Sequence, residues 1–248
     1  ICMGYIGHTG NQAANHAVNE CDFLLVLGSR LDIRQTGTVV DMFAHNANIA
    51  WVDIDANELE NPRVNVKWKV HLDINKFCNI FLDACHKIND YDKKWQKNLL
   101  SIKNQRVEDI PKKESDYIQP RILLDRISDA MCDDLTVVVT GVGCHQHWAA
   151  RHLPYDPVLH AYIASGGHGT MGYDLPSSIG VAMACPEKKV LCVVGDGSLL
   201  MNIQELASLY ERQLNVKILV LNNSRLGIVS QFQLITWGDD PTTGDFIS

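Results

Sequence analysis

The feature that most limits the fold is a pair of short apolar segments, each ending in a polar turn, with a helical pattern between them. Val190–Val194 leads into Gly195–Ser198, and Val216–Leu221 leads into Asn222 and Asn223. Apolar runs of this length predict strands that are covered on both faces of a parallel sheet. The segment between them predicts a helix with one apolar face, formed by Ile203, Leu206, Ala207 and Tyr210.

The two polar turns suit a metal and a diphosphate. Asp196 and Asn223 would lie at the carboxyl ends of two parallel strands, where open α/β sheets bind ligands. A carboxylate and a carboxamide suit Mg²⁺, which prefers oxygen ligands and shares its shell with phosphates. Gly195 and Gly197 allow close approach of a diphosphate, and a helix starting near Ser198 would point its amide dipoles at it. A tight turn and a capping asparagine are the alternative for either half alone, but the complete order favours the diphosphate site.

Composition excludes several classes of protein. The chain has 248 residues, room for one large or two ordinary domains. A net charge of −7 argues against nucleic acid as the main partner. No apolar run has the roughly 18 residues of a membrane span, and no basic and apolar leader is present, so we expect neither membrane insertion nor secretion. The 8 cysteines form no Cys-x-x-Cys pair, which favours reduced thiols and a cytoplasmic protein.

Strand and helix patterns alternate along most of the chain. We expect helices at residues 11–19, 73–88, 121–131 and 176–184, and further strands at residues 23–27, 49–54 and 135–140. Charged residues crowd the stretch 89–119, which we interpret as a linker holding one short surface helix around Trp95, Leu99 and Ile102. After the strand ending at Leu221, we expect no further strand or helix to close the sheet. The expected fold class is therefore α/β, with two doubly wound parallel-sheet domains of three layers, both incomplete.

Several segments resemble the thiamine diphosphate (ThDP) enzymes, and within them the large catalytic subunit of acetolactate (acetohydroxyacid) synthase. In the second half these segments are Thr140–Arg151, Ala164–Ala182, Gly195–Ala207 and Asn222–Gln233. In the first half they are Gly4–Gly10, Gly28–Gly37 and Trp51–Leu59.

The resemblance also implies a domain organisation. Residues 1–88 would be the C-terminal part of a middle domain, residues 89–119 a linker, and residues 120–248 a ThDP diphosphate-binding domain without its C-terminal end. No segment resembles the family's pyrimidine-binding domain, which carries the catalytic glutamate. We therefore expect an internal piece of a longer protein that turns over nothing by itself.

The resemblance assigns roles in the second domain. Mg²⁺ would be held by Asp196, Asn223 and the backbone carbonyl of Arg225. The diphosphate would be bound by Val142, Gly143, His145, Gly195, Gly197 and Ser198. The remainder of the cofactor would lie against Gly169, Met171, Gly227 and Ile228, with Met171 holding it in the bent form.

In the first domain the resemblance implies FAD. The residues concerned are Gly28, Arg30, Asp32 and Arg34 in a nucleotide loop and Asp53 and Asp73 near the adenosine. Arginines suit a diphosphate and an acid at a strand end suits a ribose. Related enzymes bind ADP, another nucleotide or nothing at this place, and these alternatives stay open.

The implied activity is that of a ThDP- and Mg²⁺-dependent carboligase of branched-chain amino acid biosynthesis. It would decarboxylate pyruvate and transfer the hydroxyethyl unit to a second 2-keto acid. Met171, Ile228 and Phe232 are the candidate catalytic residues. Phe232 stands where the family has a Trp that selects the acceptor substrate. This difference indicates either that the protein uses a different acceptor or that one aromatic residue has conservatively replaced another. Cys144 replaces a glutamine, and we interpret it as a tolerated substitution rather than a nucleophile.

The expected assembly is a homodimer or homotetramer, with a regulatory subunit as a further partner. The alternatives are another ThDP-dependent decarboxylase, C–C hydrolase or lyase, or a non-catalytic nucleotide-binding module. A dinucleotide oxidoreductase is disfavoured, since no Gly-x-Gly-x-x-Gly follows a predicted strand.

Overall fold

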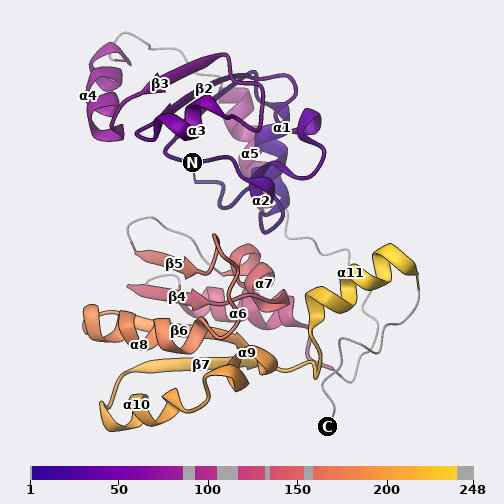
Figure 1. Cartoon of the computed structure of the whole chain (residues 1–248), viewed down its shortest axis with the longest axis vertical. Coiled ribbons are helices and arrows are strands. Elements are labelled where there is room, and N and C mark those ends of the chain that lie inside the picture. Colours follow the sequence, from indigo (N-terminus) through magenta and orange to yellow (C-terminus); the bar gives the residue numbers. More distant parts are fainter. Residues whose placement is uncertain (1, 86–92, 105–116, 132–134, 154–158, 239–248) are drawn as a thin grey trace. The chain divides into compact units, whose positions relative to one another are not determined.

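The chain divides into two compact units, unit 1 (Met3–Lys112) and unit 2 (Lys113–Ser248) (Figure 1). The computed structural model describes residues 2–85, 93–104, 117–131, 135–153 and 159–238. Both units are built on parallel sheets with flanking helices, so the predicted α/β fold class is confirmed. None of the helices in these ranges has the length and apolar composition that a membrane crossing needs.

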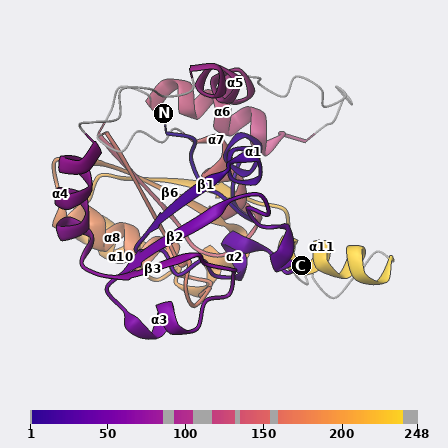
Figure 2. The same cartoon turned by 90° about the horizontal axis from the view of Figure 1, so that it is seen from above.

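Unit 1 contains a three-stranded parallel sheet in the order β1-β2-β3, seen from above in Figure 2. The strands are β1 (Phe23–Leu27), β2 (Asn48–Asp53) and β3 (Trp68–His71). The helices are α1 (Gln12–Glu20), α2 (Ile33–Thr36), η1 (Val40–Met42), α3 (Ala56–Glu60), α4 (Ile74–Cys85) and α5 (Lys93–Asn104). The core forms around Trp51 on the central strand, which is fully buried against Val26, Leu31 and Ile49.

The helix predicted within the linker is α5, and it packs on α1. Its residue Leu99 is buried, so this helix belongs to unit 1 rather than standing apart from it. Most of the other residues between 89 and 119 lie outside the described ranges, and the boundaries of the linker stay a prediction.

Unit 2 contains a four-stranded parallel sheet in the order β5-β4-β6-β7 (Figure 1). The strands are β4 (Thr136–Thr140), β5 (His160–Ala164), β6 (Lys189–Gly195) and β7 (Val216–Leu221). The helices are α6 (Pro120–Met131), α7 (Cys144–His152), α8 (Asp174–Ala184), α9 (Asp196–Met201), α10 (Glu205–Glu211) and α11 (Gly227–Trp237).

Alternation along β4 explains the three layers of unit 2. Val138 points into a cluster with Leu124 of α6 and Ala149 of α7. Its neighbours Val137 and Val139 point to the opposite face and pack against Ala182 of α8. Because successive side chains of a strand alternate between faces, a strand such as β4, whose three central residues are all valine, needs helices on both sides.

The structure corrects the expectations for the region after β6. The single predicted helix is two, α9 and α10, because Asn202 has a non-helical backbone and donates its side-chain N–H to the carbonyl of Gly172 at 2.7 Å. The apolar face predicted for this helix is exposed in α10. Strand β7, predicted to be covered on both sides, is an edge strand of the described sheet, and Val220 is 40% exposed. Helix α11 follows β7 along the chain.

Candidate functional site

The strand order of unit 2 creates a crevice between β4 and β6. The chain leaves β4 toward β5 on one side and returns to β6 on the other side of β4. The turns that follow these two central strands therefore run in opposite directions at the carboxyl edge of the sheet. Ligands of open α/β sheets bind at such a reversal of strand order.

A cavity of about 150 Å³ lies at this edge. Its walls come from the turns after β4, β6 and β7 and from the loop before α8, and its lining residues are Val142–His145, Trp148, Met171, Gly195–Ser198, Leu221, Asn223 and Arg225–Val229. Complete small-molecule sites typically measure roughly 300–1,000 Å³. This cavity therefore has room for one end of a cofactor.

The structure brings together most of the residues that the sequence predicts for ThDP and Mg²⁺. Twelve predicted residues line the cavity, namely Val142, Gly143, His145, Met171, Gly195, Asp196, Gly197, Ser198, Asn223, Arg225, Gly227 and Ile228. Gly169 is not among the lining residues; it lies in the loop between β5 and α8 with a φ of 76°. Phe232 is also outside the lining, 61% exposed on α11 with its ring edge-on to Trp237.

Three helices begin at the cavity. The N-caps of α7, α9 and α11 are Gly143, Gly195 and Leu226, and none of these caps forms a side-chain hydrogen bond to its helix. The N–H groups of a first turn have no partner within the helix, and the helix dipole makes this end positive. The cavity is thus suited to an anion such as a phosphate.

Glycine is required where the backbone passes closest to its neighbours. A Cβ atom on Gly143 would lie 2.5 Å from Cε1 and Nδ1 of His145. A Cβ on Gly227 would lie 2.8 Å from Sγ of Cys144 and 2.9 Å from Nδ2 of Asn223. Any side chain at these positions would displace residues of the cavity wall, whereas glycine leaves the backbone open to a ligand.

The donors for a metal are oxygen atoms of mixed type. Asp196 supplies a carboxylate, Asn223 a carboxamide, and the main chain of Arg225 a carbonyl, and all three residues line the cavity. The side-chain oxygen of Asn223 accepts from the N–H of Arg225 at 3.3 Å, which holds this turn in place. Within the described ranges no group of three or more His, Cys, Asp or Glu residues could hold a metal. The donor set fits Mg²⁺, which takes few protein ligands and completes its shell with phosphates and water.

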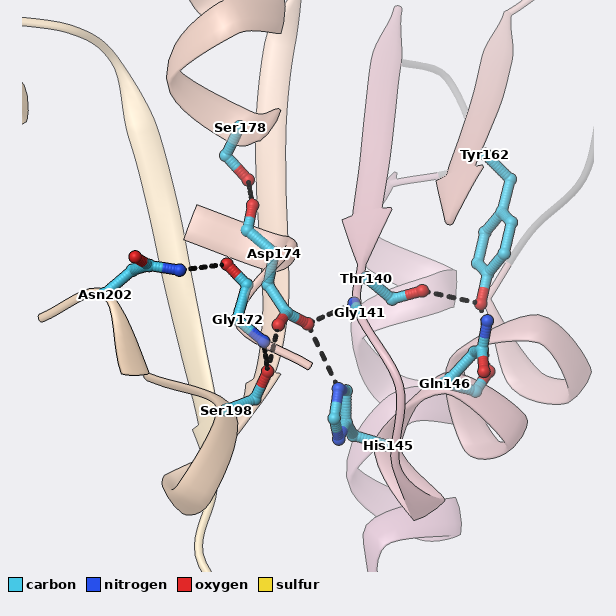
Figure 3. Close-up of polar contacts among 10 residues, drawn as sticks. All are labelled: Thr140, Gly141, His145, Gln146, Tyr162, Gly172, Asp174, Ser178, Ser198 and Asn202. Carbon is cyan, nitrogen blue, oxygen red and sulfur yellow. Dashed lines mark hydrogen bonds and ion pairs between the residues drawn. The ribbon is translucent and has the colours of Figure 1, made fainter. Parts of the chain in front are cut away.

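Sequence reasoning missed the carboxylate of Asp174, which is fully buried and does not line the cavity. Its hydrogen bonds are drawn in Figure 3. The carboxylate accepts hydrogen bonds from the N–H of Gly141, from Nε2 of His145 at 3.1 Å, and from the hydroxyl of Ser198. Burial by itself would raise the pKa of Asp174, but these hydrogen bonds outweigh it, and the pKa is lowered. The available signal was a charged residue in an otherwise uncharged segment, Tyr173–Cys185.

Cys144 lines the cavity as a protonated thiol. Burial raises its pKa above the ordinary value, and the backbone hydrogen bond that opposes this effect is weaker. Because the thiolate is the nucleophilic form, this environment supports a tolerated substitution at Cys144 rather than a nucleophile.

The residues of unit 1 predicted to bind a nucleotide lie at the ends of its strands, where Gly28 follows β1, Asp53 ends β2 and Asp73 precedes α4. The carboxylates have structural partners. Asp32 caps α2 and forms an ion pair with Arg30 at 3.0 Å. Asp53 accepts the N–H of Asp55 at 2.9 Å, and Asp73 accepts two N–H groups at the start of α4. Arg34 lies in α2, where its carbonyl accepts the N–H of His8 at 2.7 Å. Nucleotide binding by these residues stays a prediction.

Two family models match different parts of the chain, one mainly in each unit. Residues 141–246 match the model of the thiamine pyrophosphate enzyme C-terminal TPP binding domain, and residues 1–80 match that of the central domain. The chain is 38% identical to the large subunit of acetolactate synthase isozyme 2 and 37% identical to that of isozyme 1, both from Escherichia coli. It is 35% identical to the chloroplastic acetolactate synthase of Arabidopsis thaliana. These alignments cover 93%, 94% and 94% of this chain, but only 40%, 40% and 35% of the respective relatives.

Proposed function

We propose that the cavity of unit 2 holds the diphosphate of ThDP through Mg²⁺, because the chain belongs to the thiamine pyrophosphate enzymes. The observation that carries this proposal is the convergence of Asp196, Asn223 and three helix N-termini at the reversal of strand order. When bound, ThDP supplies a carbon nucleophile and an electron sink for decarboxylation of a 2-keto acid.

We further propose that the protein is a carboligase similar to acetolactate synthase. It decarboxylates pyruvate, releases CO₂ and joins the hydroxyethyl unit to a second 2-keto acid. Met171 and Ile228 provide apolar contacts beside the cofactor, and Gly169 and Gly227 make room for it. The chain spans about 40% of the length of the curated relatives that support this activity, and the activity is proposed for the whole protein.

The residues of the chain have separate tasks in this scheme. Asp196 and Asn223 hold the metal, and the helix N-termini bind the phosphate oxygens that the metal does not contact. His145 and Ser198 contribute polar atoms to the cavity wall. Phe232 selects the acceptor, so Phe232→Trp raises the product formed from 2-ketobutyrate relative to the product formed from pyruvate alone.

The same proposal covers assembly and location. The E. coli relatives are named large subunits, which supports a second subunit, here proposed to be regulatory. A homodimer or homotetramer of this chain is proposed with it. The thiols of Cys21, Cys78, Cys85, Cys185 and Cys192 support a reducing compartment such as the cytoplasm. FAD is the nucleotide proposed for the strand ends of unit 1.

The deciding experiment is calorimetric titration of ThDP into the full-length protein, with Mg²⁺ and with EDTA. Binding should need Mg²⁺ and should weaken more than about tenfold in Asn223→Ala, since a metal donor is lost. Asn222→Ala is the matched control, because it removes the adjacent amide, which does not line the cavity. Equal affinities in the two variants, or Mg²⁺-independent binding, would exclude the proposed metal site. Acetolactate formation from pyruvate then tests the reaction itself.

A further inference from the structure

The buried carboxylate of Asp174 connects both sides of the crevice. Asp174 is the first residue of α8 and is 0% exposed. Its partners are Gly141 in the turn after β4, His145 in α7 and Ser198 in α9, three elements that surround the crevice (Figure 3). Two of these partners, His145 and Ser198, line the cavity, whereas Asp174 does not.

The chemistry of these groups fixes the direction of each hydrogen bond. An ionised carboxylate can only accept, and the hydrogen bonds around Asp174 hold its pKa low. His145 must therefore carry a proton on Nε2, and Ser198 must point its hydroxyl hydrogen at Asp174. The oxygen of Ser198 also accepts the N–H of Gly172 at 2.8 Å. One carboxylate thus sets both the tautomer of His145 and the rotation of the Ser198 hydroxyl.

The second ring nitrogen of His145 lies on the cavity side. Its Nδ1 would be 2.5 Å from a Cβ on Gly143 and 3.0 Å from a Cβ on Gly195. Both glycines line the cavity and are the N-caps of α7 and α9. With Nε2 held by Asp174, the ring is anchored behind the site and presents its other edge to the glycines where an anion would bind.

We propose that Asp174 is a positioning residue of the diphosphate site, acting on the ligand through His145 and Ser198. This inference rests on the proposed function, since it takes a diphosphate as the ligand of the cavity. Asp174 itself contacts no ligand; its carboxylate orients two side chains that do. A mainly structural role would instead stabilise the crevice without changing what His145 presents to a diphosphate.

Asp174→Asn separates these roles with little change in shape. The amide oxygen accepts more weakly than the ionised carboxylate, so it no longer fixes the proton of His145 on Nε2, while the amide nitrogen faces Ser198. That nitrogen can only donate, so the Ser198 hydroxyl loses its acceptor and turns away. The matched control is Asp125→Asn. Asp125 of α6 pairs at 3.0 Å with His152 of α7, the helix that also carries His145, and Asp125 does not line the cavity.

The first measurement is the ¹⁵N spectrum of the His145 ring in the full-length protein without ligand. We expect Nε2 to be protonated in the wild type and the proton to be shared between the two ring nitrogens in Asp174→Asn. A wild-type ring protonated only on Nδ1 would overturn the inference. This result is independent of ThDP and so does not depend on the proposed function.

The second measurement is the affinity for ThDP with Mg²⁺ and, separately, for inorganic diphosphate. Asp174→Asn should weaken both about tenfold, equivalent to about 1.4 kcal/mol, whereas Asp125→Asn should leave them unchanged. In a His145→Gln background the effect of Asp174→Asn should shrink, because residues that act through one another are not additive. Undiminished affinity in Asp174→Asn, or full additivity with His145→Gln, would overturn the inference.

Two further outcomes remain decisive. If Asp174→Asn does not fold, His145→Gln alone should still weaken diphosphate binding about tenfold, and no loss would overturn the inference. If the wild type binds inorganic diphosphate but not ThDP, the proposed function fails while the role of Asp174 survives.

Discussion

Replacing Gly143 by alanine should disrupt unit 2 out of proportion to the single methyl group added. The new Cβ would lie 2.5 Å from two atoms of the His145 ring, closer than real Cβ contacts. The ring cannot move freely, because its Nε2 is bound to the buried Asp174. Either the backbone before α7 shifts or the ring leaves its partner.

Each of these two responses has a known cost. Overpacking a filled site costs about 1–3 kcal/mol. Losing a hydrogen bond to a charged group costs about 1.5–3 kcal/mol. Whichever of the two occurs, we expect Gly143→Ala to lower the free energy of unfolding of unit 2 by about 1–3 kcal/mol.

Gly180→Ala is the matched control within the same unit. Gly180 is exposed in α8, and no atom lies within 4 Å of a Cβ built there. Alanine is a better helix former than glycine by about 0.5–1 kcal/mol, so this variant should be slightly more stable than the wild type. The same chemical change should therefore have opposite signs at the two glycines.

Hydrogen exchange of the amides in β4 and β6 measures this in unit 2 alone, since central strands exchange only when the unit opens. The experiment avoids assuming that both units unfold in one transition. If Gly143→Ala exchanges as slowly as the wild type, the ring of His145 is not fixed against the turn after β4. Such a result would contradict the close contact between Gly143 and His145 in the cavity wall.

Three other predictions concern unit 2. Leu124→Ala should cost about 2–5 kcal/mol in urea unfolding, because Leu124 is fully buried, whereas Ile122→Ala on the exposed side of the same helix should change little. Because the folded-state pKa of Asp174 is lowered, its stabilisation is present above the unfolded-state pKa of about 4 and is lost as the pH falls through the folded-state value. Asp174→Asn should therefore be less stable than the wild type at pH 7, and the difference in urea unfolding should narrow as the pH falls below about 4. Burial raises the pKa of Cys192 to about 11, so this thiol should resist alkylation at pH 8 in the folded protein and react after unfolding, as mass spectrometry can follow; rapid labelling of the native protein would contradict the burial.

The strands were predictable where packing on both faces makes their sequence a continuous apolar run. Strands β4 and β6 lie at the centre of the sheet with helices on both faces, so the residues in the middle of each strand are apolar. Strands β3 and β5 were missed. Both are short and carry histidine at one end, and neither has the continuous apolar run or the clean alternation that predicts a strand.

The division between α9 and α10 depends on a contact that the local sequence does not contain. Helical spacing continues from Ser198 to Tyr210, and helix periodicity favours a single element. The break occurs because Asn202 binds the backbone of Gly172, 30 residues earlier in the chain. A tertiary contact of this kind overrides local propensity.

The candidate site was predictable to the extent that it consists of strand ends. Parallel strands place their carboxyl ends at one edge, so Asp196 and Asn223 could be brought together from sequence alone. Asp174 could not, because its partners Gly141, His145 and Ser198 come from three other elements. The position of Phe232 outside the cavity lining depends on how α11 runs, and no local pattern determines that.

The order of the sheet in unit 2 has a consequence for how the protein is made. The partner of β4 on the crevice side is β6, and their pairing begins with Thr136 opposite Lys189. A ribosome must therefore release the whole of β5 and α8 before the crevice has its second wall. Such sequence-distant pairing is slow, because the entropy of closing the intervening loop is lost before the contacts form. The ligand site is thus among the last features of unit 2 to form, and cofactor arriving during synthesis would meet it only in a nearly finished fold.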